Sequence, residues 1–142
     1  MKARLYTDGA ARGNPGPAGA GVLLVNSQGR PVGRATLYLG QATNNQAEYR
    51  ALLLGLALAQ AAGVTDLEIL LDSELVVRQL TGRYAVRSPD LQPLWQRVQE
   101  ALRAFRTVRI THVAREANRE ADRLANRAID EALGPGPAPG ST

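Results

Sequence analysis

The sequence predicts an α/β fold, in which helices cover the faces of a mixed β-sheet. Three strand-like segments come first in the chain, and helical and strand-like segments then alternate to its end. Consecutive strands favour antiparallel pairing, whereas strands separated by helices favour parallel pairing. At 142 residues, of which 44% are hydrophobic, the chain is long and apolar enough to form one domain with its own core.

The first half of the chain predicts three strands and one long helix. In chain order they span residues 2–8, 19–26, 31–39 and 45–62. A Gly/Pro/Asn segment at 13–17 predicts a turn after the first strand, and Ser27-Gln28-Gly29-Arg30 predicts a hairpin between the next two. The helix is rich in Ala and Leu and apolar nearly all round, which favours central packing against a sheet, and Gly63 is a typical stop.

The second half predicts two strands and three helices in alternation. The strands span residues 65–71 and 107–113, and the helices span 73–80, 91–104 and 117–132. Ser73 is a typical N-cap for the first of these helices, and Pro89 comes just before the second. Residues 134–142 are rich in Gly and Pro, which predicts a disordered tail after a folded domain of residues 1–133.

The composition excludes several classes of protein. The chain has no cysteine, which excludes disulfides, zinc–thiolate sites and thiol nucleophiles. No apolar run approaches the ~20 residues of a membrane span, and no basic and apolar leader precedes the first strand, so we expect a cytoplasmic protein. The net charge is +4, and Lys2 is the one lysine among 17 basic residues. Arginine suits bidentate phosphate contacts, although the coding bias of a GC-rich genome also explains its excess.

Four carboxylates stand in contexts that suit metal ligands. Asp8 and Asp72 come where hydrophobic strands end, and Glu48 and Asp122 lie on predicted helices. Taken singly, each acid is more often a turn, helix-start or solvated residue, so the inference rests on the four together. If the first and fourth strands are parallel neighbours, they lie ~4.8 Å apart, and two carboxylates at their ends could share a cation.

Such a cluster predicts divalent metal ions and phosphate chemistry. Four carboxylates this close repel one another, and hard oxygen ligands favour Mg²⁺ and Mn²⁺. Two metal ions roughly 3.5–4 Å apart suit in-line displacement at a phosphodiester. An acidic centre in a basic chain therefore indicates an enzyme that acts on nucleic acid.

Five motifs resemble, in order, those of type 1 ribonuclease H. They are Thr7-Asp8-Gly9, Gly13-Asn14-Pro15-Gly16, Thr43-Asn44-Asn45-Gln46-Ala47-Glu48, Asp72-Ser73 and Asn118-Arg119-Glu120-Ala121-Asp122-Arg123-Leu124-Ala125. The resemblance extends from residue 2 into the last predicted helix. It implies a five-stranded mixed sheet of order 3-2-1-4-5 in which strand 2 is antiparallel to the others, and this agrees with the predicted elements.

The resemblance also implies an activity. Members of this family hydrolyse the RNA strand of RNA/DNA hybrids and leave 5′-phosphate and 3′-hydroxyl ends. By resemblance, two Mg²⁺ or Mn²⁺ ions are held by Asp8, Glu48, Asp72 and Asp122. We therefore expect a monomeric endoribonuclease whose partner is an RNA/DNA hybrid and not a membrane.

Five further residues match positions that contact the hybrid in this family. Asn14, Asn44 and Asn45 match contacts to the minor groove, where amides can donate to and accept from 2′-hydroxyls and base edges. As alternatives, Asn14 is a turn residue and Asn44 a helix cap. Thr43 and Asn118 match residues that hold a phosphate of the DNA strand.

The loop before Asp122 is shorter than in the best-known members, which carry a histidine there. His112, the one histidine, falls within the last predicted strand, and we interpret it as structural. Arg115, at the start of the loop, is the better candidate for assisting catalytic turnover or product release. Trp95 has helical spacing with neighbouring apolar residues, which favours a core position over a base-stacking one.

Two other functions remain open at this point. One is a DNA resolvase or transposase-type nuclease of similar fold, which the asparagine motifs disfavour because DNA has no 2′-hydroxyl. The other is a hybrid-binding module without catalysis, which the presence of all four acids disfavours. Cleavage of double-stranded RNA or of RNA–DNA junctions is not decided by the sequence.

Overall fold

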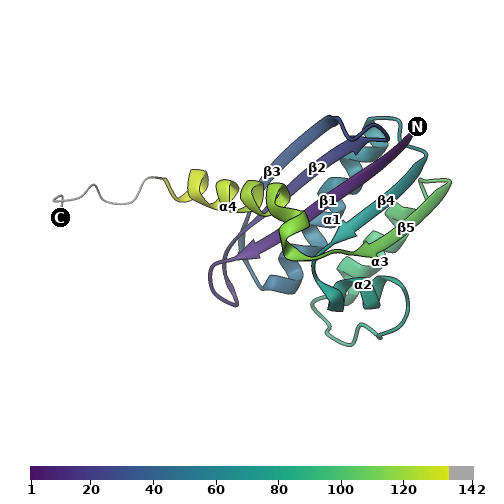
Figure 1. Ribbon diagram of the computed structural model, residues 1–142. Coiled ribbons are helices and arrows are strands. Elements are labelled where there is room, and N and C mark those ends of the chain that lie inside the picture. The colour runs from purple at the N-terminus through teal and green to yellow at the C-terminus, as the bar shows by residue number, and fades with distance from the viewer. Residues whose placement is uncertain (135–142) are drawn as a thin grey trace, which may run out of the picture.

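The computed structural model describes residues 1–134, and these form one five-stranded sheet with helices on both faces (Figure 1). Its strands are β1 (Lys2–Ala11), β2 (Gly16–Asn26), β3 (Pro31–Ala42), β4 (Asp66–Leu71) and β5 (Thr107–His112). Its helices are α1 (Asn44–Ala61), α2 (Glu74–Leu80), α3 (Gln92–Leu102), the short 3-10 helix η1 (Arg115–Asn118) and α4 (Arg119–Leu133). Apart from residue 134, the predicted tail lies outside the described residues.

The sheet has the order β3-β2-β1-β4-β5. β2 is antiparallel to β1 and β3, whereas β1, β4 and β5 are parallel. This confirms the α/β fold class and the strand order that the family resemblance implied. The central strand, β1, has a partner on each side, so both of its edges are paired over much of its length.

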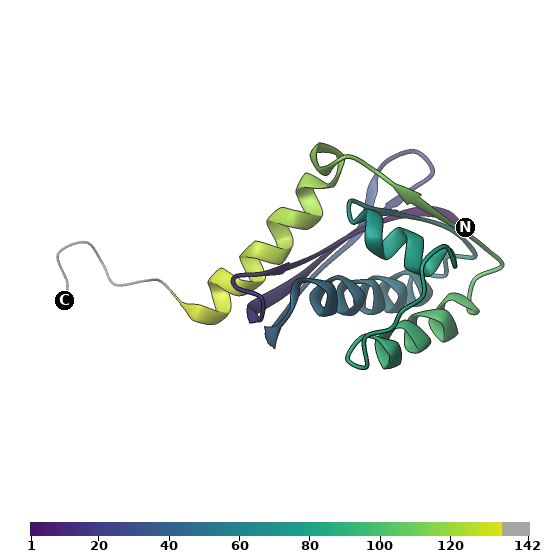
Figure 2. The same ribbon diagram turned by 90° about the horizontal axis from the view of Figure 1, so that it is seen from below.

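The helices cover the two faces of the sheet unequally. Figure 2 shows α4 on one side and α1 with α3 on the other. The main core lies between the sheet and α1, and its largest fully buried side chains include Leu5, Leu24, Tyr49, Leu52, Leu56, Ile69 and Leu71. Trp95 packs against this core, and its Nε1 donates to the Gln79 carbonyl at 3.2 Å, so its predicted core position is confirmed.

The ends of several elements differ from the sequence prediction. β1 continues to Ala11 because its pairing with β2 runs to Ala18, and β2 begins at Gly16 because Gly16 pairs with Ala42 of β3. The predicted helix 117–132 starts instead with a 3-10 turn, and Leu133 ends it. In the described part of the chain, no helix is both long and apolar enough to cross a membrane.

Candidate metal centre and nucleic-acid interface

The centre of the site lies where β1 and β4 separate. Their parallel pairing ends at Tyr6 and Leu70, and Asp8 and Asp72 each follow two residues later. The prediction that Asp8 comes at the end of its strand is wrong. β1 continues because Asp8 pairs with Gly21 of β2, so the backbone of Asp8 is held on one side by a regular antiparallel ladder.

A close contact between β1 and α1 brings Glu48 to Asp8. A Cβ atom on Gly9 would lie 2.1 Å from the backbone carbon of Ala47, so only glycine permits this approach. The Gly9 N–H donates to Glu48 Oε1 at 3.0 Å. Helix α1 itself begins with a capping box, in which Thr43 and Gln46 bond each other's backbone N–H groups, and Glu48 follows in the second turn.

A second close contact places Asp122. A Cβ atom on Gly21 of β2 would lie 2.1 Å from the carbonyl oxygen of Ala121, so α4 packs directly on the strand backbone. Asp122, the next residue, then lines the same hollow as Asp8. The last helix therefore delivers the fourth carboxylate from the opposite face of the sheet to Glu48.

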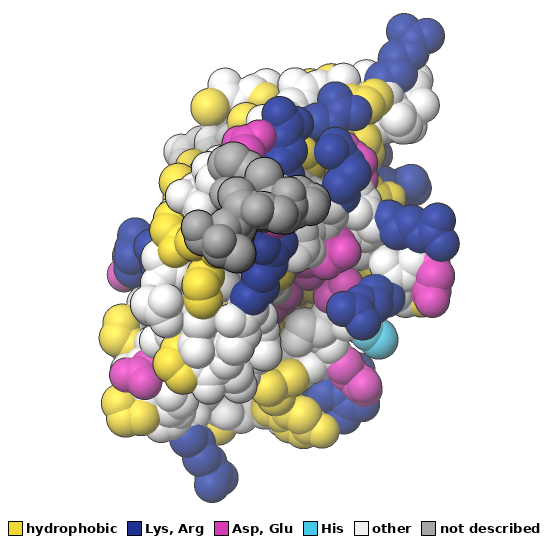
Figure 3. All heavy atoms as spheres, turned by 90° about the vertical axis from the view of Figure 1, so that its left-hand side faces the viewer, with side chains coloured by type: hydrophobic (Ala, Val, Ile, Leu, Met, Phe, Trp, Pro, Cys, Tyr) yellow, Lys and Arg dark blue, Asp and Glu magenta, His cyan; other side chains and the backbone are white. Residues whose placement is uncertain are grey.

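The four carboxylates line one hollow of about 560 Å³. Carboxylate oxygens of Asp8, Glu48 and Asp72 all lie within 4.8 Å of one another. The same hollow is also lined by Asn44, Asn45, Ser73, Arg115, Asp122 and Asn126. Figure 3 shows acidic side chains gathered in a hollow on one face of the molecule, with basic side chains around it.

Burial and mutual repulsion shift the ionisation of this cluster. Burial, and then the nearby Glu48, Asp122 and Asp72, raise the pKa of Asp8 to about 10. Burial also raises the pKa of Glu48 to about 7, although the hydrogen bond from Gly9 opposes the shift. Two of these acids therefore resist ionisation unless a cation offsets the repulsion.

The donor set fits a divalent cation. Glu48 is buried, and its Oε1 accepts from Gly9, but its Oε2 has no hydrogen-bond partner among the residues that the structure describes. An orphaned carboxylate oxygen that faces other carboxylates is suited to a metal ion. Asp8, Glu48 and Asp72 offer the hard oxygen atoms that Mg²⁺ and Mn²⁺ prefer.

The expected hybrid contacts surround the start of α1. Asn44 and Asn45 line the acidic hollow. Asn14, in the turn between β1 and β2, is exposed, and its Oδ1 accepts from the Asn44 N–H at 3.0 Å. The turn and the helix start are thereby joined into one surface. Thr43 is partly exposed, and its hydroxyl oxygen accepts from Gln46.

Asn118 is not placed as a surface phosphate contact. Its side chain is 1% exposed, and its Nδ2 donates to the Thr7 carbonyl at 2.9 Å and to Asp72 Oδ2 at 3.4 Å. Contact with a phosphate of the DNA strand, which the resemblance implies, would require this enclosed side chain to become accessible. The packing of η1 on β1 turns Asn118 inward, where it supports Asp72.

Arg115 and His112 lie on different sides of the short loop. Arg115 is exposed and lines the acidic hollow. His112 ends β5, and it lines a separate hollow beside α2 together with Glu74 and Arg78. His112 is exposed, so it is no core residue.

Sequence reasoning missed four residues that shape the site. Gly9 and Gly21 permit the two close contacts. Both lie inside strands, and a glycine inside a strand often marks a place where another backbone approaches closely. Arg12 and Asn126 contact each other across 114 positions of the chain, for which the sequence carries no local signal.

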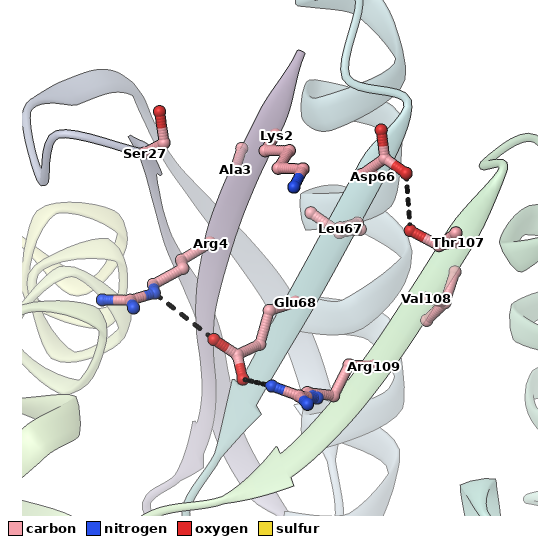
Figure 4. A pocket seen from close by; sticks show the side chains of 10 residues that line it. All are labelled: Lys2, Ala3, Arg4, Ser27, Asp66, Leu67, Glu68, Thr107, Val108 and Arg109. Carbon is pink, nitrogen blue, oxygen red and sulfur yellow. Dashed lines mark hydrogen bonds and ion pairs between the residues drawn. The ribbon is translucent and has the colours of Figure 1, made fainter.

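A second hollow, of about 450 Å³, lies at the other end of β1 and β4. Figure 4 shows Glu68 of β4 between Arg4 of β1 and Arg109 of β5. The closest nitrogen–oxygen distances are 3.3 Å to Arg4 and 3.8 Å to Arg109. Unlike the acidic hollow, this one is lined by residues of both charges, and its Glu68 carboxylate is paired with arginines.

Comparison with known proteins agrees with this geometry. A family model described as reverse transcriptase-like matches residues 6–128. Ribonuclease HI of Halobacterium salinarum is 47% identical over 113 residues, which are 80% of this chain and 57% of that protein. The bifunctional protein Rv2228c of Mycobacterium tuberculosis is 44% identical over 119 residues, 83% of this chain but 33% of that protein. The chain thus spans between one third and about three fifths of these relatives.

Solved structures match over nearly their full length. The crystal structure of RNase H1 from Halobacterium salinarum has a TM-score of 0.90 and 46% identity, with coverage of 92% of this chain and 99% of that one. LC11-RNase H1, solved in complex with an RNA/DNA hybrid, has a TM-score of 0.89 and 39% identity, with coverage of 93% and 99%. With this fold, this acidic centre and these matches, the chain belongs to the type 1 ribonuclease H family.

Proposed function

We propose that this chain is an endoribonuclease that hydrolyses the RNA strand of RNA/DNA hybrids. The observation that carries the proposal is the group of Asp8, Glu48 and Asp72, whose oxygens lie within 4.8 Å of one another in an otherwise basic chain. Ribonucleases H among its relatives, and the complex of LC11-RNase H1 with an RNA/DNA hybrid, support the substrate.

The bound cofactor would be two Mg²⁺ or Mn²⁺ ions held by Asp8, Glu48, Asp72 and Asp122. Such ions, when bound, supply an activated water and charge stabilisation at the leaving oxygen. Attack of water on the phosphorus breaks the bond to the 3′-oxygen, which takes up a proton. The products are a 3′-hydroxyl end and a 5′-phosphate end.

The chain's own groups prepare the centre for this chemistry. The Gly9 N–H fixes one oxygen of Glu48, which leaves the other oxygen for coordination. Asn118 donates to Asp72 and so limits the rotation of that carboxylate. Preorganised ligands of this kind stabilise charge in the transition state without first having to reorganise.

The asparagines beside the hollow suit a strand that carries 2′-hydroxyls. Asn14, Asn44 and Asn45 would contact the minor groove of the hybrid, since amides both donate and accept. Thr43 accepts from Gln46 and retains its hydroxyl hydrogen, which can donate to a phosphate of the DNA strand. Arg115 would assist turnover or product release from the rim of the hollow.

The experiment that tests this proposal follows an end-labelled RNA strand in three contexts: paired with DNA, paired with RNA, and single-stranded. Each is incubated with Mg²⁺, Mn²⁺ or a chelator, and with wild-type protein or Asp8→Asn. We expect metal-dependent cutting of the hybrid that is lost in the variant. Cutting of the RNA duplex at the same rate would contradict the hybrid preference, and no cutting with either metal would contradict the enzyme.

A further inference from the structure

The carboxylate of Asp122 has a hydrogen-bond partner one helical turn further along α4. Asn126 Nδ2 donates to Asp122 Oδ1 at 3.3 Å and to the Asp122 backbone carbonyl at 3.0 Å. Asn126 is partly buried and lines the acidic hollow. Its amide therefore contacts one of the four acids directly, without being an acid itself.

A residue from the opposite end of the sequence holds the other side of that amide. Arg12, in the turn after β1, uses its Nη2 to donate to Asn126 Oδ1 at 3.3 Å and to the Asn126 carbonyl at 3.4 Å. Its Nη1 is paired with Asp130 Oδ1 at 2.7 Å. The guanidinium group therefore has fixed partners on α4.

These contacts determine which way the amide points. If the Asn126 side chain were rotated by half a turn about its last bond, its NH₂ group would meet the donors of Arg12, and its oxygen would meet the acceptors of Asp122. Both contacts would be repulsive, because donors would face donors and acceptors would face acceptors. Asn126 is thus held with its donor toward Asp122.

We propose that Asn126, oriented by Arg12, is a positioning residue that holds the Asp122 carboxylate for metal coordination. This rests on the proposed function of the site. Groups that hydrogen-bond metal ligands fix their rotamers, and their removal typically costs about 10–100-fold in metal affinity or activity. Asn126 reaches the metal centre only through Asp122, and Arg12 only through Asn126.

Two other roles for Arg12 predict different results. As a contact to a phosphate of the hybrid, Arg12 would change the KM for hybrid and leave metal binding alone. As a general positive charge near the acidic hollow, it would weaken metal binding, so its removal would strengthen that binding. Only a positioning role predicts that removal of the positively charged Arg12 side chain weakens the binding of a metal cation.

The test is calorimetric titration of the full chain with Mn²⁺ in the absence of nucleic acid. We expect Asn126→Ala to bind Mn²⁺ about 10–100-fold more weakly than wild type, and Arg12→Ala to show a smaller loss of the same sign. Arg12→Lys should resemble Arg12→Ala, because lysine keeps the charge but not the two-sided contact. Arg127→Ala is the matched control, since Arg127 is paired with Glu131 on the same helix and does not line the hollow.

Hybrid cleavage and thermal melting complete the test. Asn126→Ala should lower kcat with little change in the KM for hybrid, and it should melt close to wild type because alanine favours the helix. Mn²⁺ affinity and kcat within twofold of wild type would overturn the proposal, as would a lowered melting temperature with unchanged metal affinity. Because the titration contains no substrate, a chain that binds Mn²⁺ as expected but cuts no hybrid refutes the function and not this inference.

Discussion

Charged residues four positions apart mark the two ends of the β1–β4 pair, Arg4 and Asp8 on β1, and Glu68 on β4 with Asp72 just after it, and the two ends behave in opposite ways. At one end Glu68 lies between Arg4 and Arg109, with nitrogen–oxygen distances of 3.3 and 3.8 Å. At the other end Asp8 and Asp72 meet further carboxylates. An even spacing along a strand keeps side chains on one face, so the two clusters lie about 13 Å apart on the same sheet.

At one end of the β1–β4 pair the carboxylate is neutralised by arginines of the chain, whereas at the other end the carboxylates lack such partners in the described part of the chain and suit a bound cation. The Glu68 carboxylate is already paired with two arginines, so this cluster needs no bound cation. The Asp8 cluster is buried and repulsive, which costs stability and is tolerated where a ligand offsets it. The two clusters belong to the same pair of strands, so they differ because Glu68 has arginines as neighbours and Asp8 has carboxylates.

The strongest test removes one charge within β4, at Glu68, and one just after it, at Asp72. Asp72→Asn should reduce hybrid cleavage by at least about a thousandfold, because a loss of ~4 kcal/mol of metal-dependent stabilisation corresponds to that factor. Glu68→Gln, the matched change four residues earlier, should leave kcat within twofold. The measurement is single-turnover cleavage of a labelled hybrid at saturating Mg²⁺.

An equal loss in both variants would show that the sheet as a whole, and not the acidic end, determines activity. Circular dichroism and melting curves serve as the control for folding. Asp72→Asn should fold normally, since it relieves repulsion between the carboxylates.

The next test moves one ligand without removing it. Gly9→Ala adds a Cβ atom that would lie 2.1 Å from the Ala47 backbone, so α1 must shift away from β1 and carry Glu48 with it. Overpacking of this kind costs typically 1–3 kcal/mol, and a displacement of about 1 Å can reduce activity about 100-fold. Urea unfolding and hybrid cleavage measure the two effects.

Gly33→Ala provides the control for that substitution. Its added Cβ would meet only the Leu58 side chain, at 3.2 Å, which can adjust. We expect a small change in stability and unchanged cleavage. A Gly9→Ala variant with wild-type kcat would show that the position of Glu48 is not set by this contact.

The sequence alone predicts the strands, the helices and the acidic residues of the site, but not how they lie relative to one another. Periodicity and turn residues indicate every strand and α-helix, and the contexts of Asp8, Glu48, Asp72 and Asp122 indicate the acidic cluster. The order of the strands came from the family resemblance, because periodicity does not say which strands are neighbours. The position of Asp8 inside β1 depends on its pairing with β2, which no local pattern specifies.

Long-range packing explains what the sequence could not show about individual side chains. The family resemblance predicts that Asn118 holds a phosphate of the DNA strand, but η1 packs on β1 and buries this side chain. Arg12 and Asn126 are polar residues in a turn and a helix, where solvent exposure is the usual expectation. Their contact exists only because α4 lies across the start of the β1–β2 turn.

The carboxylates at the two ends of the β1–β4 pair should also change the folding stability with pH in opposite directions. The Asp8 cluster should give the larger change. Folding raises the pKa of Glu48 from 4.5 to about 7 and that of Asp8 from 3.8 to about 10. The folded protein therefore binds more protons than the unfolded chain, and stability is lost as pH rises through this interval. Without metal, the urea midpoint should fall between pH 5 and pH 9.

Metal and mutation should each reduce that fall. Saturating Mn²⁺ offsets the repulsion in place of protons, so the midpoint should change less with pH. Asp8→Asn removes one of the two shifted groups and should flatten the metal-free profile. A profile that is equally steep in wild type and Asp8→Asn would show that the fall arises elsewhere in the chain.

We expect the smallest effect at Asp66, which lies at the same end of the β1–β4 pair as the Glu68 cluster. Hydrogen bonds from Thr107 and Thr65, together with Arg106, lower the pKa of this partly buried carboxyl from 3.8 to about 2. Its contribution is therefore present above about pH 4 and lost as pH falls toward 2, the reverse of the acidic hollow. Asp66→Asn should lower the urea midpoint slightly at pH 7, since the exposed partner Arg106 makes the ion pair weak, and should match wild type near pH 2. If the difference in urea midpoint between wild type and Asp66→Asn grew as the pH fell, the hydrogen-bond donors around Asp66 would not stabilise its charged form. The two carboxylate clusters would then differ in burial alone.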